Sequence, residues 1–468
     1  MGASCSSPFP SPPPPPPPPP AESNAPSTSA MDGMAPHPPH PAAGGGPVML
    51  MPYVDADRTL RALAGAAEGF GCRVTSLCRL WFGLISNNLD PHGTAARPSS
   101  GGRMGASCST PFPPPPRPAM DGMAPQHHQH PHPNPHPSPG GGPVMPYADA
   151  DRTLRALAGA AEGFGRRAIG GLHGPLYRVT SLDDDGHGTL RQACRAHGPL
   201  WIVFDVSGDI HLRTYLRVTS HKTIDGRGQR VRLLGKGLQL KECRHVIVCN
   251  LQIEGGRGHD VDAIQIKPSS ADIWIDRCSL ADCDDGLIDI TRGSTDVTVS
   301  RCRFSRHDKT MLVGADPSHT GDRGIRVTVH HCFFDGTRQR HPRVRFGRAH
   351  LYNNYTRGWG IYAVAAGVEA QVASQCNVYE AGAEKKAVFR YMPERAADRE
   401  EAEAGWVRSE GDAFLNGARP CLVDGGDAAV FRPEEYYERW TMEAASPALK
   451  EVVQLCAGWQ PVPRPPGE

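Results

Sequence analysis

Acidic and basic side chains recur in consecutive segments of the second half of this chain, at a spacing that suggests a shared site. Asp260 and Asp262 precede one short apolar run, Asp285 precedes the next, and Asp289 lies inside that second run. Lys309 follows 24 residues after Asp285, a distance close to one repeat of the surrounding pattern. Carboxylates gathered in this way repel one another unless a cation lies among them. Oxygen ligands without histidine or cysteine favour Ca²⁺ over zinc.

A cluster of three arginines, Arg340, Arg343 and Arg345, follows one repeat further along the chain. Fixed lysine and arginine side chains beside bound Ca²⁺ suit a polyanion, because its carboxylates can bridge the metal and a guanidinium group. The alternative is a ladder of solvated surface salt bridges. Spacing alone does not decide between the two interpretations.

Short β-rich runs recur about every 22–30 residues and would position these side chains. Each run has three to five residues, and no helical spacing lies between them; four examples are Val246–Val248, Ile273–Ile275, Val297–Val299 and Val327–Val329. This period is typical of a solenoid in which each coil pairs with the next. The sequence therefore predicts an all-β protein, a parallel β-helix whose strand edges are protected by stacking.

Alternation along the runs predicts which side chains point into the solenoid. Ile288 and Ile290 are expected to point inward and Asp289 outward. Val344 and Phe346 are expected to point inward, and the arginines beside them outward. The acidic and basic side chains would therefore line one outer face.

The fourteen cysteines show no CxxC pair and no spacing suited to zinc. Cys278, Cys302 and Cys332 occupy one position in three successive coils, which favours a stacked ladder of small buried side chains. Four histidines lie among prolines and indicate a low-complexity His/Pro tract: His127, His128, His130 and His132.

Five segments in order carry a resemblance to a known family: Asp260-Val-Asp-Ala-Ile-Gln-Ile, Trp274-Ile-Asp276-Arg277, Asp284-Asp-Gly-Leu-Ile-Asp289, His307-Asp-Lys309 and Arg340-His-Pro-Arg343-Val-Arg345. From about Gly198 to Gly382 the chain resembles the plant pectate lyases of polysaccharide lyase family 1. The resemblance implies a right-handed parallel β-helix. It also implies calcium-dependent β-elimination of (1→4)-α-D-galacturonan in pectate, giving 4,5-unsaturated oligogalacturonides.

By position, the resemblance assigns Asp260, Asp285 and Asp289 as calcium ligands and Arg340 as the catalytic arginine. Lys309 and Arg345 match the residues that hold substrate carboxylates, and Arg343 is a third candidate for that role. Two features depart from the family pattern. Arg277 stands where the family has histidine, and one extra residue separates Asp260 from Asp276, so Asp262 competes with Asp260 as a ligand.

Three other functions remain open. The first is a non-catalytic β-helix that binds cell-wall polysaccharide. A pectin lyase is disfavoured because Asp285 and Asp289 supply a calcium set. A polygalacturonase would hydrolyse with paired carboxylates such as Asp284 and Asp285, yet no Arg-Ile-Lys element follows them.

The first 165 residues are expected to form a largely disordered leader, and residues 166–468 the β-helix domain. The chain contains 47 prolines, of which 34 fall within the first 150 residues. The leader holds a near-identical duplication, since the seventeen residues 55–71 return unchanged as residues 149–165. Each copy predicts one short helix, over residues 56–68 and 150–162. Further helices are predicted over residues 190–196, as a cap, and over residues 433–445.

The net charge of +1 argues against a general nucleic-acid binder. The chain is expected to be monomeric, with polygalacturonate as its partner. Gly2 and Cys5 fit an acylation pattern and suggest possible lipid anchoring. The resemblance implies action in the cell wall, whereas the start of the chain lacks an evident secretory signal, which leaves a cytoplasmic or membrane-associated alternative.

Overall fold

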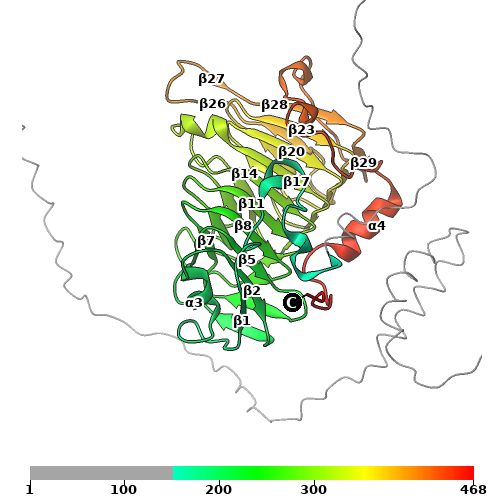
Figure 1. Ribbon diagram of the computed structural model, residues 1–468. Helices are drawn as coiled ribbons and strands as arrows, with labels where there is room; N and C mark the ends of the chain where they lie inside the picture. The colour runs from blue at the N-terminus through cyan, green and yellow to red at the C-terminus, as the bar shows by residue number, and fades with distance from the viewer. Residues whose placement is uncertain (1–150, 468) are drawn as a thin grey trace, which may run out of the picture. The chain divides into compact units, whose positions relative to one another are not determined.

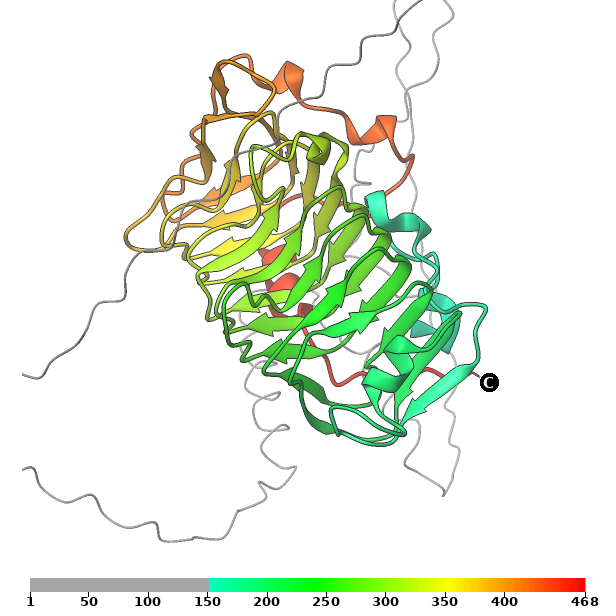
Figure 2. The ribbon, with the colours of Figure 1, turned by 90° about the vertical axis from the view of Figure 1, so that its left-hand side faces the viewer.

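The computed structural model describes residues 151–467, and most of these belong to a parallel β-helix (Figure 1). Successive turns contribute strands to three parallel sheets of ten, eight and nine strands. Figure 2 shows the strands of neighbouring turns stacked along the axis of the solenoid. The predicted fold class is therefore confirmed.

Within each sheet, strands that are neighbours in space come from successive turns of the solenoid. The ten-stranded sheet contains β1 (Leu176–Val179), β2 (Leu200–Phe204), β5 (Lys222–Asp225), β8 (Arg244–Cys249), β11 (Ala271–Asp276), β14 (Thr295–Ser300), β17 (Arg326–His330), β20 (Arg348–Tyr352), β23 (Gln371–Gln375) and β28 (Trp406–Glu410). The eight-stranded sheet contains β4 (Leu216–Val218), β7 (Leu238–Leu240), β10 (Ile264–Ile266), β13 (Gly286–Ile290), β16 (Lys309–Val313), β19 (Arg343–Val344), β22 (Val364–Ala366) and β25 (Phe389–Tyr391). The nine-stranded sheet contains β3 (Gly208–His211), β6 (Val231–Leu234), β9 (Gln252–Glu254), β12 (Ser279–Ala281), β15 (Arg303–Ser305), β18 (Phe333–Asp335), β21 (Tyr355–Arg357), β24 (Val378–Glu380) and β29 (Ala413–Leu415). An antiparallel pair, β26 (Glu394–Arg395) and β27 (Ala402–Glu403), lies outside these sheets.

Apolar side chains stacked from turn to turn form the core. Val246 of β8 is in register with Ile273 of β11, followed by Val297 of β14 and Val327 of β17. All four are fully buried, and burial of each such side chain stabilises the fold by about 1.5–3 kcal/mol. The four β-rich runs predicted from the sequence are therefore consecutive strands of one sheet.

A ladder of small side chains runs along one corner of the solenoid. The backbone N–H of Cys278 donates to Sγ of Cys302, and that of Cys302 donates to Sγ of Cys332, each at 3.4 Å. Burial raises the pKa of the Cys278 and Cys302 thiols, which disfavours the reactive thiolate. The predicted cysteine ladder is confirmed. It continues through hydrogen bonds to Asn354, Asn377 and Asp412.

Asp412 ends this ladder and makes stability depend on pH. Burial raises its pKa to about 6, although its carboxylate accepts hydrogen bonds from Ser374 and Ser409. Asp412 binds its proton more tightly in the folded protein than in the unfolded chain. The protonated carboxyl therefore contributes its full stabilisation of the fold below about pH 4, and this contribution is lost as the pH rises through 6. Because the side chain is partly exposed, we expect Asp412→Asn to raise the free energy of unfolding by about 1 kcal/mol at pH 7.5. Urea unfolding should show a smaller gain at pH 4.5; an equal change at both values would contradict this.

The segment before β1 packs on the outside of the ten-stranded sheet. Its 3₁₀ helices are η2 (Leu154–Leu157) and η3 (Gly163–Arg167), and Phe164 contacts the rings of Tyr436 and Tyr437 edge-on. The helix predicted over residues 150–162 is therefore wrong where the structure describes it. At the end of this segment the backbone approaches the sheet closely, since a Cβ on Gly165 would lie 2.6 Å from the carbonyl oxygen of Ile273. Residues 162 and 165 bond to Thr298 of β14, so this segment packs on the domain that was predicted to begin at residue 166.

Arg277, which stands where the family has histidine, binds a residue of this segment. Arg277 is 5% exposed and donates to Asp151 at 3.0 and 2.6 Å. Arg227, which is 1% exposed, donates to the same carboxylate at 3.1 Å. Asp225 and Asp276 are further carboxylate partners of Arg227 and Arg277, respectively. Asp151 therefore bridges two buried arginines and fastens the segment to the β-helix.

Asp151→Ala is expected to lower the free energy of unfolding by about 3 kcal/mol, because it leaves buried guanidinium charge undercompensated. Urea unfolding at neutral pH measures this loss. Asp424→Ala, which removes an exposed carboxylate from a loop, is the matched control and should change stability by less than about 0.5 kcal/mol. Equal effects of the two substitutions would contradict the assigned role of Asp151.

Two α-helices flank the β-helix. The helix α3 (Leu190–Arg195) places Leu190, Ala193 and Cys194 in the main core and confirms the predicted cap. The helix predicted over residues 433–445 is wrong, since this stretch holds only the 3₁₀ turn η6 (Pro433–Glu435). The helix instead is α4 (Pro447–Cys456), whose N-cap Ser446 accepts from the N–H of Leu449.

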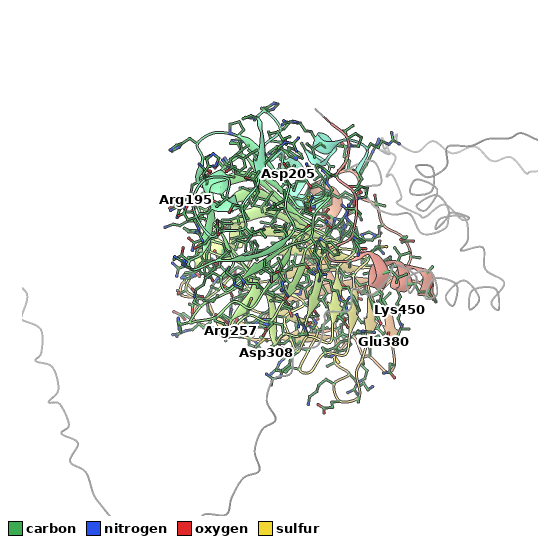
Figure 3. All side chains as sticks on the ribbon, turned by 90° about the horizontal axis from the view of Figure 1, so that it is seen from below. Arg195, Asp205, Arg257, Asp308, Glu380 and Lys450 are labelled. Carbon is green, nitrogen blue, oxygen red and sulfur yellow. The ribbon has the colours of Figure 1, made fainter. Side chains whose placement is uncertain are left out.

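Helix α4 packs against the nine-stranded sheet. Leu449 and Val453 pack with Phe333 and Tyr355 of that sheet. Lys450 pairs with Glu380 of β24 at 2.6 Å, and Figure 3 shows these two side chains together. None of the helices within residues 151–467 is long and apolar enough to span a membrane.

Several predictions fall on residues that precede the described part of the chain. The acylation candidates Gly2 and Cys5, the first copy of the repeat and the histidine tract all lie there. They stay predictions.

Candidate active site

The acidic and basic residues lie on one face, the outer side of the eight-stranded sheet. Lys309 begins β16 and is in register with Gly286 of β13. Asp289 of β13 and Arg343 of β19 occupy the same column, with Leu312 of β16 between them. The predicted common face is therefore present over four adjacent strands, β10, β13, β16 and β19.

Asp262 and Asp289 form a buried pair of carboxylates at the centre of this face. Asp262 is fully buried and Asp289 is 7% exposed. A Cβ placed on Gly286 would lie 2.7 Å from Oδ1 of Asp262 and 2.8 Å from Oδ1 of Asp289, so both oxygens flank this glycine. Burial raises the pKa of both carboxyl groups. Negative charge nearby adds to this rise, from Asp262 for Asp289 and from Asp285 for Asp262.

Hydrogen bonds fix the orientation of Asp262. Its Oδ1 accepts from the backbone N–H of Gly286 at 2.6 Å, and its Oδ2 accepts from the amide of Gln265 at 2.9 Å. The backbone N–H of Asp262 donates to the hydroxyl of Tyr215 at 2.8 Å. The strand β10 and its neighbours therefore hold this carboxylate in place before any ligand arrives.

Asp260 and Asp285 are turned toward lysines. Asp260 is 53% exposed at its side chain and lies 3.3 Å from Nζ of Lys267. Asp285 forms an ion pair with Lys309. Of the two competing candidates, the structure therefore places Asp262 beside Asp289, and it places Asp260 at the edge of the acidic group.

In residues 151–467, no set of three or more histidine, cysteine, aspartate or glutamate side chains is already gathered as a metal cage. Lysines neutralise the two outer acids: Lys267 lies 3.3 Å from Asp260 and 3.9 Å from Asp262, and Lys309 pairs with Asp285. The carboxylate patch predicted from the sequence is thus present as two paired acids with two further acids beside them.

Arg340 lies close enough to the acidic group for its charge to oppose the rise in the pKa of Asp289. It has a positive φ of 66°, and its carbonyl oxygen accepts from the N–H of Met311 on β16 at 2.9 Å. Its Nε is buried without a hydrogen-bond partner in the described part of the chain. The hydroxyl of Tyr362 is likewise buried. Burial raises the pKa of Tyr362, while the charges of Arg343 and Arg340 and an interaction of the hydroxyl with Arg340 oppose the rise.

Arg343 and Arg345 share one carboxylate, that of Glu394 on β26. Arg343 donates to Glu394 at 2.7 Å, and Arg345 donates to both of its oxygens at 2.8 and 2.9 Å. The two arginine side chains are 14% and 11% exposed. Burial lowers the pKa of Arg343, and the neighbouring Arg345 adds to this. Like Lys309, these two candidate substrate ligands are therefore engaged within the protein itself.

Phe346 does not point into the main core as the alternation predicted. Its φ is 53°, so the strand ends before it, and its ring packs in a separate cluster with Val368 and Ala396. The short strand β19 carries only Arg343 and Val344. This turn explains why Arg345 reaches toward Glu394.

Sequence reasoning missed three residues of this face: Lys267, Tyr362 and Glu394. Lys267 follows strand β10 directly, seven residues after Asp260 in the same turn. Glu394 lies 49 residues after Arg345 in a hairpin that no repeat predicts.

Comparison with known proteins identifies the family to which this chain belongs. A family model described as pectate lyase matches residues 206–394. Pectate lyase 1 of Ambrosia artemisiifolia is 38% identical over 314 residues, which cover 62% of this chain and 77% of that protein. The putative pectate lyase 21 of Arabidopsis thaliana is 41% identical over 282 residues, which cover 56% and 71%.

Solved structures share the fold. The crystal structure of Jun a 1, the major allergen from cedar pollen, matches with a TM-score of 0.58 and 34% identity, over 67% of this chain and 97% of that one. A pectate lyase of Bacillus sp. N165, solved in complex with trigalacturonate, matches with a TM-score of 0.52 over 64% of this chain and 98% of that one. Its identity is 21%, so it supports the fold alone.

The fold and its charged face thus define a β-helical polysaccharide lyase. The chain belongs to the plant pectate lyases of polysaccharide lyase family 1, and it is an enzyme of pectate lyase activity.

Proposed function

We propose that this enzyme cleaves de-esterified homogalacturonan by calcium-dependent β-elimination. The observation that carries the proposal is the buried pair Asp262 and Asp289 beside Arg340 on one face of three neighbouring strands. Such an arrangement brings a cation site and a guanidinium to the same stretch of an extended sugar chain.

The residues of the acidic group fit Ca²⁺. Their donors are carboxylate oxygens alone, and the central pair has oxygens on both sides of Gly286. Asp262, Asp289 and Asp285 would hold the ion, with Asp285 exchanging its contact to Lys309 for the metal, and Asp260 at the edge. Bound Ca²⁺ supplies positive charge that draws electron density from a substrate carboxylate and makes the proton on C5 more acidic.

Basic residues of the chain orient the substrate and stabilise the negative charge that develops on it during the reaction. Lys309 lies one strand from Asp289 and would bind a galacturonate carboxylate once released from Asp285. Arg340 lies beside this position, where its guanidinium stabilises the carbanion formed when C5 loses its proton. Hydroxide from the solvent takes the C5 proton, or Arg340 itself takes it. The electron pair then forms the C4–C5 double bond as the C4–O bond breaks, and the leaving oxygen takes a proton from water, which yields an unsaturated end and a new reducing end.

The assay of this proposal follows ultraviolet absorbance of the conjugated product on polygalacturonate. We expect absorbance to rise with Ca²⁺ and to stop on addition of a chelator. Formation of reducing ends without absorbance would identify a hydrolase instead. Binding of polygalacturonate with neither signal would support the non-catalytic alternative.

A hydrolytic pair of carboxylates finds less support. Asp284 accepts from the N–H of Gly258 at 2.7 Å and lies near Arg257, whereas Asp285 pairs with Lys309. Asp284 and Asp285 therefore contact different residues, and their carboxylates are not directed at a common point.

We further propose that the enzyme acts in the cell wall, because its polymeric substrate is found there. A carboxyl-terminal fluorescent fusion expressed in plant cells is expected to accumulate outside the plasma membrane. Retention in the cytoplasm would contradict this proposal.

A further inference from the structure

Glu394 occupies a position at the charged face that resembles the place of a substrate carboxylate. Its Oε1 accepts from Nη2 of Arg343 at 2.7 Å and from Nη2 of Arg345 at 2.9 Å. Its Oε2 accepts from Nε of Arg345 at 2.8 Å. Paired donation of this kind is the geometry by which arginine recognises any carboxylate. A galacturonate carboxylate that approached these arginines would therefore meet a carboxylate already bound.

The hairpin that carries Glu394 is anchored to the β-helix. Ala396 is buried against Phe346 and Val368, and the N–H of Ala397 donates to the carbonyl oxygen of Pro317 at 3.2 Å. Asp398 accepts from Arg323 at 2.7 and 2.9 Å. These contacts fix the backbone that carries Glu394, so its carboxylate is held at the two arginines.

The remaining donors of Arg345 are also used. Its Nη1 donates to the carbonyl oxygens of Ala315 at 2.8 Å and Gly314 at 3.3 Å. Arg343, in contrast, has a buried Nε without a partner in the described residues. Two cations and one anion leave a single net positive charge at this position. A polyanion is therefore attracted less strongly here than two unpaired arginines would attract it.

We propose that Glu394 is a specificity-determining residue that competes with substrate carboxylates for Arg343 and Arg345. The inference rests on the proposed function, since it assumes that galacturonate chains bind along this face. A methyl-esterified galacturonate has no charge with which to displace Glu394, and it loses nothing by the presence of Glu394. Glu394 therefore reduces the ratio by which the enzyme prefers de-esterified polymer over partly esterified polymer.

Glu394→Gln tests this because glutamine keeps the size and one acceptor but removes the charge. We expect KM for polygalacturonate to fall about two- to fivefold, with kcat unchanged. KM for highly methyl-esterified pectin should stay within experimental error, and the polygalacturonate effect should shrink at high salt. Glu394→Asp keeps the charge and should stay closer to the native enzyme. A merely structural role would move both substrates together and would not depend on salt.

Glu403→Gln is the matched control. Glu403 is exposed and lies opposite Glu394 in the pairing of β26 with β27, so the same charge is lost from the same hairpin without contact to the two arginines. An unchanged or higher KM of Glu394→Gln for polygalacturonate would overturn the inference, as would an equal fall for Glu403→Gln. Dissociation constants for polygalacturonate, measured by calorimetry, give the same comparison without turnover. Failure of the native enzyme to form unsaturated product would count against the proposed function. The role of Glu394 is decided separately, by whether Glu394→Gln binds polygalacturonate more tightly than the native protein and Glu403→Gln.

Discussion

Replacing Arg340 with lysine is expected to lower kcat on polygalacturonate by about a thousandfold and to leave KM within about threefold. The positive φ of Arg340 fixes its backbone next to Met311, and its buried Nε has no partner among the described residues. Lysine retains the charge but offers a compact ammonium group in place of a planar set of donors. The rate of formation of unsaturated product measures the loss.

Arg338→Lys is the control for this substitution. Arg338 lies two residues earlier, is exposed, and pairs with Asp308 at 3.3 Å. We expect this variant to keep native kcat, and both variants to keep the native melting temperature. If Arg340→Lys retained more than about a tenth of kcat, or if the control lost as much, Arg340 would not be the residue that meets the developing charge.

Replacing Asp289 with asparagine is expected to weaken calcium binding by at least about a hundredfold. The same change should raise the stability of the metal-free protein by about 1–3 kcal/mol, because it replaces a buried carboxyl group whose ionisation is unfavourable. The opposite signs share one origin: burial and the neighbouring Asp262 disfavour an ionised Asp289 in the metal-free protein, and a bound cation would favour it. Calorimetric titration with Ca²⁺ and urea unfolding in chelator measure the two effects.

Asp260→Asn is the comparison that separates the two candidate ligands. Asp260 is exposed and paired with Lys267, so we expect its loss to weaken calcium binding less than about tenfold. Unchanged calcium affinity in Asp289→Asn would contradict the assignment. An effect of Asp260→Asn as large as that of Asp289→Asn would instead restore the assignment made from the resemblance.

The strands and their order were readable from the sequence because a solenoid repeats its local pattern. Lys309 lies 24 residues after Asp285, and one turn of the β-helix places it beside Gly286. The outward position of Asp289 followed from alternation within one strand. Each of these inferences needed only contacts between neighbouring turns.

The remaining differences from expectation have local physical causes. The assignment of Asp260 as a ligand stays a prediction; its φ of 54° turns the chain, and its side chain lies beside Lys267 at the edge of the acidic group. The helix at Pro447–Cys456 had a readable start, since Ser446 before Pro447 is a typical N-terminal signal. Glu394 could not be found in this way, because its partners lie 49 and 51 residues away and belong to a different structural element.

Digestion of polygalacturonate in water labelled with heavy oxygen, followed by mass spectrometry of the products, tests the central claim most directly. Elimination adds no water across the broken bond, so with Ca²⁺ present we expect unsaturated oligogalacturonides that carry no label from the cleavage step. Saturated products with one heavy oxygen at each new reducing end would show hydrolysis and would contradict the account.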